Sequence, residues 1–358
     1  MPTDRPAVIV TGSSGMLGRP TCRRLAAAGY EVFGFDRVGL PEPPVDSEFV
    51  QDVECDLTNY SNVRAAVSDV KQRCGGHLAS VVHLAAYYDF SGADSPLYKK
   101  VTVEGTDRLL NALSGFELEQ FLFSSTMLIH APTEPGEYIT ENSPLKAQWP
   151  YPQSKIDTER LIREAHPNER SVFLRIAGVY SEWGTQPTLV QQIKRIYEKD
   201  FESHFFPGDQ ASGQSSVHVT DAVDSILAAV ERRSLIDPQT AVLIGESDPP
   251  AYSQLQNLIG QAIHGSDWTT MYVPPALAKI GAAVIDAVQG GGAFIKPFMV
   301  SMADDHYALD ISRARELLGW QPKHRLVDFL PQIINKLLED PQRWYAQNGL
   351  DPSEVKSR

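Results

Sequence analysis

The sequence is poor in cysteine and contains no long run of basic residues. Its three cysteines, Cys22, Cys55 and Cys74, lie far apart and form no Cys-x-x-Cys pair. This scattered, odd-numbered set fits neither a disulfide framework nor a zinc site and is typical of a reducing compartment. We therefore expect a cytoplasmic protein without a bound metal. The 32 Lys and Arg against 45 Asp and Glu leave a net charge of −13, which argues against nucleic-acid binding because phosphates need clustered cations.

The sequence also lacks a hydrophobic run long enough to span a membrane. Its most apolar stretch, residues 272–288, is interrupted by Lys279 and Asp286 and is short for a span. The apolar residues 6–10 near the N-terminus are too few for a signal peptide. We expect no integral membrane segment. The 358 residues, 42% of them hydrophobic, provide core material for one large domain or two.

Short apolar runs alternate with helical patterns through the first 250 residues. The runs are continuous rather than alternating, which indicates strands buried on both faces of a parallel sheet. We predict an α/β fold of the Rossmann type, with a doubly wound sheet of about seven parallel strands and a smaller, mostly helical substrate lobe. The expected strands lie within residues 7–10, 31–35, 49–55, 80–84, 121–123, 172–176 and 241–244.

The regular alternation fails in two places, which predicts a lobe built from two separate segments. Residues 180–216 are irregular, and the chain after residue 247 is rich in helical patterns and prolines. We expect residues 1–179 and 217–247 to form the dinucleotide-binding domain, and residues 180–216 and 248–358 to form the substrate lobe.

Three glycines stand between the first expected strand and the first expected helix. Gly12, Gly15 and Gly18 suit, in turn, a tight turn, a close approach to a pyrophosphate, and close packing of the helix on the strand. The helix N-terminus offers unpaired N–H groups and a positive dipole end to the diphosphate. The expected phosphate loop comprises Gly12, Ser14, Gly15, Met16, Leu17 and Gly18.

Asp36 stands eighteen positions after Gly18, at the end of the second expected strand. A carboxylate there accepts hydrogen bonds from the adenosine ribose and repels a 2′-phosphate, so we expect NAD rather than NADP. Arg37 could hold that phosphate and favours NADP; capping of its own loop is the alternative role for Asp36. Asp56 and Leu57, after the third strand, are a candidate adenine contact, with turn formation as the alternative for Asp56.

Tyr151 and Lys155 are four residues apart. Pro152 suits the first turn of a helix, so we expect a helix beginning just after Tyr151 that carries both side chains on one face. A neighbouring ammonium is expected to lower the pKa of the phenol from about 10. Such a phenol exchanges a proton with an alcohol or ketone while hydride moves. The hydroxyls of Ser125 and Thr126 are candidates to orient the reacting oxygen.

These motifs occur in a fixed order over most of the chain. They are Thr11-Gly-x-x-Gly-x-x-Gly18, Asp56-Leu57, His83-Leu-Ala-Ala86, Ser124-Ser-Thr126, Tyr151-x-x-x-Lys155, Arg175, Gly178-Val-Tyr180, Val217-His-Val-Thr-Asp221 and Leu318-Gly-Trp-x-Pro322. In this order the chain resembles an extended short-chain dehydrogenase/reductase of the NAD-dependent epimerase/dehydratase superfamily.

The resemblance implies a role for each matching residue. It implies that Tyr151 is the acid/base and that Lys155 also holds the nicotinamide ribose. It implies that Thr126 hydrogen-bonds the reacting oxygen, with Ser125 as the alternative. It further implies that residues 84–86 (Leu84, Ala85 and Ala86) pass under the cofactor, and that homodimers form through a helix bundle.

Ligands of such sheets bind beyond the carboxyl ends of the strands. Aromatic residues there can stack on an apolar or ring-shaped substrate, and core packing is the alternative role for each. The candidate wall residues after the fourth and sixth strands are Tyr87, Tyr88, Phe90, Ala177, Tyr180 and Trp183. The aromatic segment 201–206 is interpreted as a flap or as a solvated connector.

The chain departs from the nucleotide-sugar enzymes of the family after the sixth strand. It reads Arg175-Ile-Ala-Gly178, without the Asn that those enzymes carry there, and no arginine cluster follows. This is closer to the 3β-hydroxysteroid dehydrogenase and dihydroflavonol reductase branch. We expect an NAD-dependent oxidoreductase acting on a secondary alcohol or ketone of a medium-sized, apolar small molecule. A nucleotide-sugar epimerase or dehydratase, with transient hydride transfer and tightly bound NAD, and a non-catalytic NAD-binding module are the alternatives.

Overall fold

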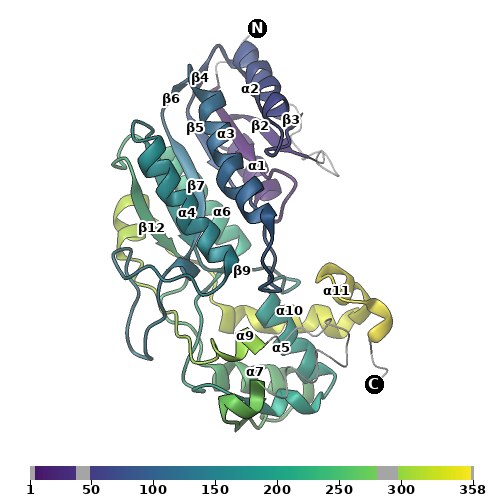
Figure 1. Cartoon of the computed structure of the whole chain (residues 1–358). Coiled ribbons are helices and arrows are strands. Elements are labelled where there is room, and N and C mark those ends of the chain that lie inside the picture. Colours follow the sequence, from purple (N-terminus) through teal and green to yellow (C-terminus); the bar gives the residue numbers. More distant parts are fainter. Residues whose placement is uncertain (1–4, 38–48, 280–296, 356–358) are drawn as a thin grey trace.

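The computed structural model describes residues 5–37, 49–279 and 297–355 of the chain (Figure 1). Most of the apolar stretch 272–288 lies outside the described residues. The described helices include none that is long and apolar enough to cross a membrane.

A seven-stranded, fully parallel sheet forms the upper part of the molecule, and all seven expected strands are present. Their order is β12-β8-β7-β5-β1-β2-β3. The sequence runs outward from β1 in one direction and then in the other, which defines the doubly wound topology. The strands are β1 (Ala7–Thr11), β2 (Glu31–Asp36), β3 (Val50–Glu54), β5 (Ser80–His83), β7 (Phe121–Thr126), β8 (Ser171–Ile176) and β12 (Thr240–Ile244).

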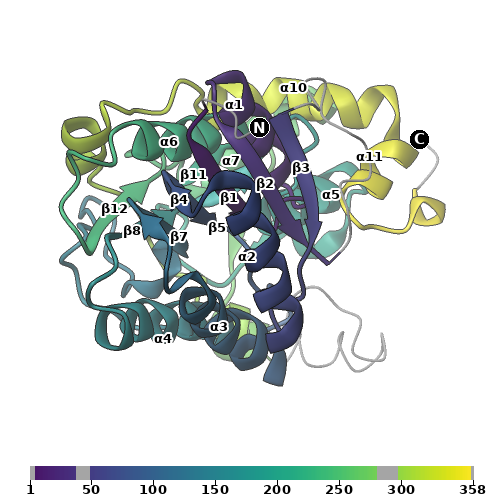
Figure 2. The ribbon, with the colours of Figure 1, turned by 90° about the horizontal axis from the view of Figure 1, so that it is seen from above.

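Helices cover both faces of this sheet, as the continuous apolar strands require (Figure 2). Val8 and Val10 pack on one face, against α1 (Gly18–Ala27) and α6 (Val219–Glu231). Ile9 points to the other face, into a core shared with α2 (Tyr60–Cys74), α3 (Glu104–Leu113) and α4 (Pro150–Ala165). A π-helical turn, η2 (Tyr98–Val103), leads into α3. The short strands β4 (His77–Leu78) and β6 (Glu117–Leu118) pair at the amino ends.

A smaller lobe lies below the carboxyl ends of the strands (Figure 1). Its core joins α5 (Pro187–Tyr197), α7 (Tyr252–His264), α10 (Leu326–Glu339) and α11 (Pro341–Gln347). Two parallel pairs connect its segments: β9 (Gly178–Tyr180) with β11 (Ser216–His218), and β10 (Phe205–Phe206) with β13 (Met271–Tyr272). Its short elements are η4 (Phe201–His204), α9 (Pro297–Val300) and η6 (Pro352–Glu354).

The stretch 307–320 packs differently from the expected domain division. Tyr307, Leu309, Ile311, Leu318 and Trp320 are buried in the core of the sheet domain, although the division assigns them to the lobe. Isolated bridges pair Tyr307 with Gln214 and Leu309 with Ile139, and η5 (Ala314–Leu318) is ended by Gly319 at φ 60°. We propose that this stretch belongs to the dinucleotide domain, because its apolar side chains face β12 and α6 rather than α10.

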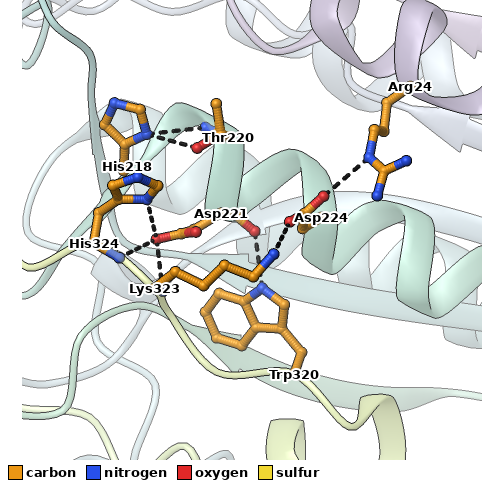
Figure 3. Close-up of polar contacts among 8 residues, drawn as sticks. All are labelled: Arg24, His218, Thr220, Asp221, Asp224, Trp320, Lys323 and His324. Atoms are coloured by element: carbon orange, nitrogen blue, oxygen red, sulfur yellow. Dashed lines mark hydrogen bonds and ion pairs between the residues drawn. The ribbon is translucent and has the colours of Figure 1, made fainter.

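Asp221 joins α6 to the chain that leads into α10 (Figure 3). This carboxylate is 1% exposed and accepts hydrogen bonds from the backbone N–H groups of Lys323 (3.0 Å) and His324 (2.9 Å) and from the His324 ring (3.1 Å). The Trp320 indole donates to the Asp221 carbonyl at 2.9 Å. The buried Asp221 carboxylate therefore accepts two backbone N–H groups where the chain enters the lobe.

We expect Asp221→Ala to lower the free energy of unfolding by about 2–4 kcal/mol, because it removes the buried acceptor of the part-buried N–H groups of Lys323 and His324. Asp224→Ala is the matched control on the same helix. Among the described residues, Asp224 forms ion pairs only with exposed Arg24 and Lys323, so its loss should cost less than about 1 kcal/mol. Urea denaturation measures both, and equal losses would contradict the account.

Candidate active site

The glycine-rich turn connects β1 to α1 at the carboxyl edge of the sheet. Gly12 has φ 69°, and its N–H donates to the Phe35 carbonyl at 2.8 Å. A Cβ on Gly18 would lie 1.9 Å from the Gly12 oxygen, so only glycine allows α1 to begin so close to the strand.

The beginning of α1 has the donors that a diphosphate needs. Leu17, at the N-cap, makes no side-chain capping bond, and the first turn contains no acidic residue. The N–H groups of Met16 and Leu17 have no acceptor among the residues that the structure describes. Free N–H groups at a helix N-terminus fit a pyrophosphate without further side chains.

Asp36 ends β2 beside this turn. One carboxylate oxygen accepts the Ser14 N–H at 3.0 Å, and the other accepts the Arg37 N–H at 2.7 Å. The side chain therefore caps its loop, as the alternative interpretation predicted. A carboxylate has about four acceptor sites, so two remain for ribose hydroxyls, and the two roles are compatible.

The other three residues predicted on the adenosine side, Arg37, Asp56 and Leu57, have different surroundings. Arg37 is exposed. The Asp56 carboxylate accepts from the Thr58 N–H (2.9 Å) and hydroxyl (2.8 Å), which is the turn-forming arrangement, and these bonds lower its pKa. Leu57 is 6% exposed and packs in the core beneath α3.

Residues 84–86 pass directly beneath the glycine turn. A Cβ on Gly12 would lie 3.0 Å from the Ala85 nitrogen, so the two backbones are in contact. Leu84, Ala85 and Ala86 are all half-buried. They occupy the surface between β1 and β7 on which a dinucleotide would rest.

His83 holds this loop through a buried chain of hydrogen bonds that sequence reasoning missed. The Thr106 hydroxyl donates to the Thr102 carbonyl (2.6 Å) and so accepts from His83 Nε2 (2.8 Å). His83 Nδ1 then accepts from the Thr11 hydroxyl (2.6 Å), whose oxygen accepts the Ala85 N–H (3.1 Å). Burial lowers the pKa of His83 to about 3 and keeps the ring neutral. The motif His83-Leu-Ala-Ala86 includes His83, but the sequence assigned this residue no role.

Tyr151, Ser125 and Thr126 meet where β7 ends and α4 begins. The helix begins at Pro150, two residues earlier than predicted, so Tyr151 lies in its first turn. Thr126 Oγ1 accepts the Leu128 N–H at 3.3 Å. The buried hydroxyl of Ser125 has no hydrogen-bond partner within the described part of the chain.

Lys155 lies beneath Tyr151 and is 2% exposed. Its Nζ donates to the Ser124 carbonyl at 2.6 Å and lies 4.7 Å from the Phe123 ring centroid and 5.8 Å from that of Tyr151. Burial lowers its pKa to about 7, against an opposing effect of Glu159.

The expected lowering of the Tyr151 pKa is wrong for the protein alone. Burial raises the pKa of the phenol, and the neighbouring phenols of Tyr88 and Tyr98 raise it further; hydrogen bonding with Thr126 only partly opposes them. The physical reason is desolvation, which disfavours both the phenolate and the Lys155 ammonium.

A row of aromatic rings extends from Tyr151 toward the lobe. Tyr88, half of it exposed, stands edge-on to Tyr151 with the ring centroids 4.8 Å apart. On the other side, Trp149 lies 5.5 Å from Tyr151, and Phe90 packs edge-on against Trp149 at 5.3 Å. Tyr87 packs against Tyr98 instead. These contacts place Tyr88 against Tyr151 and Phe90 against Trp149.

The candidates after β8 lie elsewhere. Ala177 is 6% exposed, within the core near β12. The Tyr180 ring is fully buried against His218 and Phe329 in the lobe. Trp183 faces Lys336 on α10 and Arg343 on α11. Their core-packing alternatives describe these positions better than a substrate wall does, because β9 leads the chain into the lobe core.

A cavity of about 260 Å³ lies in the lobe, and sequence reasoning missed most of its lining. Thr188, Gln192 and Arg195 line it from α5, Phe206 and Tyr252 form another wall, and Asp305 lies at its edge. Two sequence signals pointed to it: Phe90, a candidate wall residue that lines the cavity, and the aromatic segment 201–206, which forms η4 and β10. The other contributors lie within residues 186–195, 207–216, 250–255 and 299–305 and at Leu326, and these segments share no pattern.

The chain matches known proteins over most of its length. The family model described as the NAD dependent epimerase/dehydratase family matches residues 8–245. A UDP-glucose 4-epimerase of Bacillus subtilis (strain 168) is 27% identical over 187 residues, 51% of this chain and 54% of that protein, so the match spans about half of that relative. A decarboxylating sterol-4-alpha-carboxylate 3-dehydrogenase of Candida albicans is 23% identical over 363 residues, 93% of this chain and 98% of that protein.

A solved structure shows the same fold. The dTDP-glucose 4,6-dehydratase of Streptomyces venezuelae, with NAD and TYD bound, has a TM-score of 0.70 at 20% identity and covers 96% of this chain and 97% of its own.

The fold and the phosphate turn define a dinucleotide-dependent α/β enzyme. The chain belongs to the NAD-dependent epimerase/dehydratase family. The expected superfamily, sheet architecture, enzymatic nature and NAD cofactor are thereby confirmed. Within residues 5–37, 49–279 and 297–355, no three His, Cys, Asp or Glu side chains gather in a way that could hold a metal ion.

We expect Asp36→Ala to weaken NAD binding about ten- to a hundredfold, the range for hydrogen bonds to a charged acceptor. Glu54→Ala is the matched control, since Glu54 lies in register with Asp36 on β3 and is exposed. Calorimetric titration with NAD measures both affinities. Unchanged affinity in Asp36→Ala would mean that other residues hold the ribose.

Lys155 should make stability depend on pH. Its pKa is about 7 when folded and 10.5 ordinarily, so between these values only the unfolded chain binds the proton. Its contribution to the free energy of unfolding therefore rises with pH. From pH 7 to 9 the unfolding free energy of the wild type should gain about 2 kcal/mol relative to Lys155→Met. A pH-independent difference in urea denaturation would refute the burial effect.

Proposed function

We propose that the protein is an NAD-dependent oxidoreductase that interconverts a secondary alcohol and a ketone. The observation that carries the proposal is the meeting of Tyr151, Lys155 and the Ser125 and Thr126 hydroxyls at the sheet edge that also holds the glycine turn. β7 lies two strands from β1, about 10 Å at the usual strand spacing, a distance that a nicotinamide ribose can bridge.

The proposed cofactor residues are those placed along this edge. The N–H groups at the start of α1 would hold the pyrophosphate, and Asp36 would hold the adenosine ribose. Residues 84–86 would lie beneath the cofactor, and Lys155 would reach the nicotinamide ribose. When bound, NAD supplies a hydride acceptor, or as NADH a hydride donor, at its nicotinamide ring.

The protein's own residues would handle the proton. Ser125 and Thr126 would hydrogen-bond the substrate oxygen and fix its position. The Tyr151 phenolate would take the proton of the alcohol hydroxyl while the carbon loses hydride and the carbonyl bond forms; ketone reduction is the reverse. Lys155 and Tyr151 would share a proton as a coupled pair, so a protonated Lys155 would compensate the desolvation that opposes the phenolate.

The second candidate is a nucleotide-sugar epimerase or dehydratase, which the activities named for the Bacillus and Streptomyces proteins favour. The name of the Candida relative favours an apolar substrate instead. The lobe cavity supports an apolar substrate, because Arg195 is the only cation among the described residues that line it. A non-catalytic NAD-binding module is disfavoured by the presence of the Tyr151 and Lys155 pair.

The two enzymatic candidates differ in the fate of the hydride. A net oxidoreductase accumulates NADH from NAD and a secondary alcohol, and the absorbance of NADH reports it. An epimerase or dehydratase converts UDP-glucose or dTDP-glucose without net NADH. Sugar conversion with no alcohol oxidation would overturn the proposal.

We further propose a homodimer in the cytoplasm whose other partner is the small-molecule substrate. The surface between η2 and α4, where a helix bundle would form, contains a second cavity lined in part by Val103 and Leu161, and this hollow is available to a second copy. Light scattering of the NAD-bound protein measures the mass.

We expect Tyr151→Phe to reduce the rate of alcohol oxidation at least about a hundredfold, in line with lost acid–base catalysis. Binding of NAD should be unchanged, because the ring remains. Tyr138→Phe is the matched control: that phenol is half-exposed and donates to Asp248, so the rate should hold. A Tyr151→Phe rate within threefold of the wild type would contradict the assigned role.

A further inference from the structure

Arg175 and Glu159 form a buried ion pair near Lys155. Arg175 extends from β8 and Glu159 from α4, and the two residues are 4% and 3% exposed. The Arg175 Nε lies 3.1 Å from one Glu159 carboxylate oxygen, and the Arg175 Nη2 lies 2.8 Å from the other. This two-point contact uses the planar fork of the guanidinium, which a lysine ammonium cannot reproduce.

The remaining Arg175 donors are also occupied. Its Nη1 donates to the Glu141 carbonyl at 2.8 Å and to the His130 Nε2 at 3.2 Å. His130 Nδ1 donates to the Ser143 carbonyl at 3.1 Å, so Nε2 is the acceptor nitrogen of a neutral ring, and burial lowers the pKa of His130 to about 4. Arg175 is therefore fixed by three separate groups and cannot leave Glu159 without breaking buried hydrogen bonds.

Glu159 has the position of a natural partner for Lys155. The two residues are four apart on α4, the spacing at which helical side chains of opposite charge meet. The Lys155 Nζ instead donates to the Ser124 carbonyl. Arg163, one turn further along α4, lies 3.3 Å from the Glu159 carboxylate and adds a second cation to it. Arg175 and Arg163 therefore compete with Lys155 for the same carboxylate.

The other ionisable groups that face Lys155 in the described structure carry no negative charge at neutral pH. Tyr151 shares its helix, and His83 on β5 is kept neutral because burial, and then the Lys155 ammonium, lower the pKa of that ring. β7 presents the Phe123 ring and a backbone carbonyl. Burial lowers the pKa of Lys155, and among the described residues Glu159 is the one carboxylate that opposes this effect.

We propose, on the basis of the proposed function, that Arg175 is a positioning residue for the reaction, because it holds the Glu159 carboxylate away from Lys155. Lys155 then remains free to share a proton with Tyr151. Arg175 is in register with Ser125 on the neighbouring strand β7, so the ion pair is built into the same part of the sheet as the proton-handling groups.

The titration of Lys155 tests this role directly. We would label lysine isotopically at Cε in the full chain with NAD bound and follow the NMR shift with pH; the signal missing from Lys155→Met belongs to Lys155. In Arg175→Met the freed Glu159 carboxylate should pair with Lys155 and raise the titration midpoint by about one to three pH units, the effect of a nearby opposite charge. In Glu159→Gln the midpoint should fall below that of the wild type.

Two further variants keep the test decisive if either single variant does not fold. Arg175→Lys keeps the positive charge but loses the two-point contact, and should still raise the midpoint, by less than Arg175→Met. The double variant of Arg175→Met and Glu159→Gln removes the whole pair and leaves no unpaired buried charge, and its midpoint should match that of Glu159→Gln.

Asp157→Asn is the matched control, because it removes a carboxylate of the same helix that pairs with the exposed Arg160. Its midpoint should equal that of the wild type. A pair with a merely structural role would leave the midpoint of Lys155 unmoved in every variant that folds. An unchanged or lowered midpoint in the Arg175 variants, or an unchanged one in the double variant, would overturn the assignment.

Alcohol oxidation tests the reaction separately. Its pH profile should move to higher pH in Arg175→Lys, because the Lys155 and Tyr151 pair then loses its shared proton at higher pH. The predicted midpoints without any NADH formation by the wild type would refute the proposed function and leave the effect of Arg175 on Lys155 standing. NADH formation with unmoved midpoints would refute the role of Arg175 and leave the function standing.

Discussion

Parallel pairing of β1, β5 and β7 is the constraint on which the whole site depends. Ile9 is in register with Val81, and Val81 with Phe121, so the three strands end at the same edge. The glycine turn, the loop at residues 84–86 and the hydroxyls of Ser125 and Thr126 follow directly from those ends. His83 connects them, because its ring bonds Thr11 on β1 and Thr106 on α3 at once. A shift of register in any of the three strands would separate the proton-handling groups from the phosphate turn.

Desolvation controls the protonation of Lys155 and Tyr151, two of the groups that lie at this edge. The buried Lys155 has no carboxylate within direct bonding distance in the described structure; its ammonium donates to the Ser124 carbonyl and lies over the Phe123 ring. The Glu159 carboxylate, one turn further along α4, forms a two-point pair with Arg175 instead. The lysine is therefore poised to gain or lose a proton near neutral pH, as a proton-sharing partner of a phenol requires.

The sequence predicted the sheet well because its signals are local. Unbroken apolar runs such as residues 7–10 indicate burial on both faces, and the spacing of Gly12, Gly15 and Gly18 fixes a strand–turn–helix unit. The spacing of Tyr151 and Lys155 likewise fixed their shared helix face. The lobe cavity was not predictable in this way, because Gln192, Phe206, Tyr252 and Asp305 come from separate segments that only the tertiary fold brings together. The placement of Tyr180 and the raised pKa of Tyr151 were missed for a related reason: burial depends on neighbours distant in sequence.

A crystal structure of the protein with NAD and a bound ketone is the most direct test of the account. The account predicts that the Tyr151 hydroxyl lies within hydrogen-bond distance of the ketone oxygen, on the side of the nicotinamide ring that faces Thr126. A phenol turned away from that ring, with no water bridging it to the ketone, would contradict the central claim and leave only a dinucleotide-binding protein.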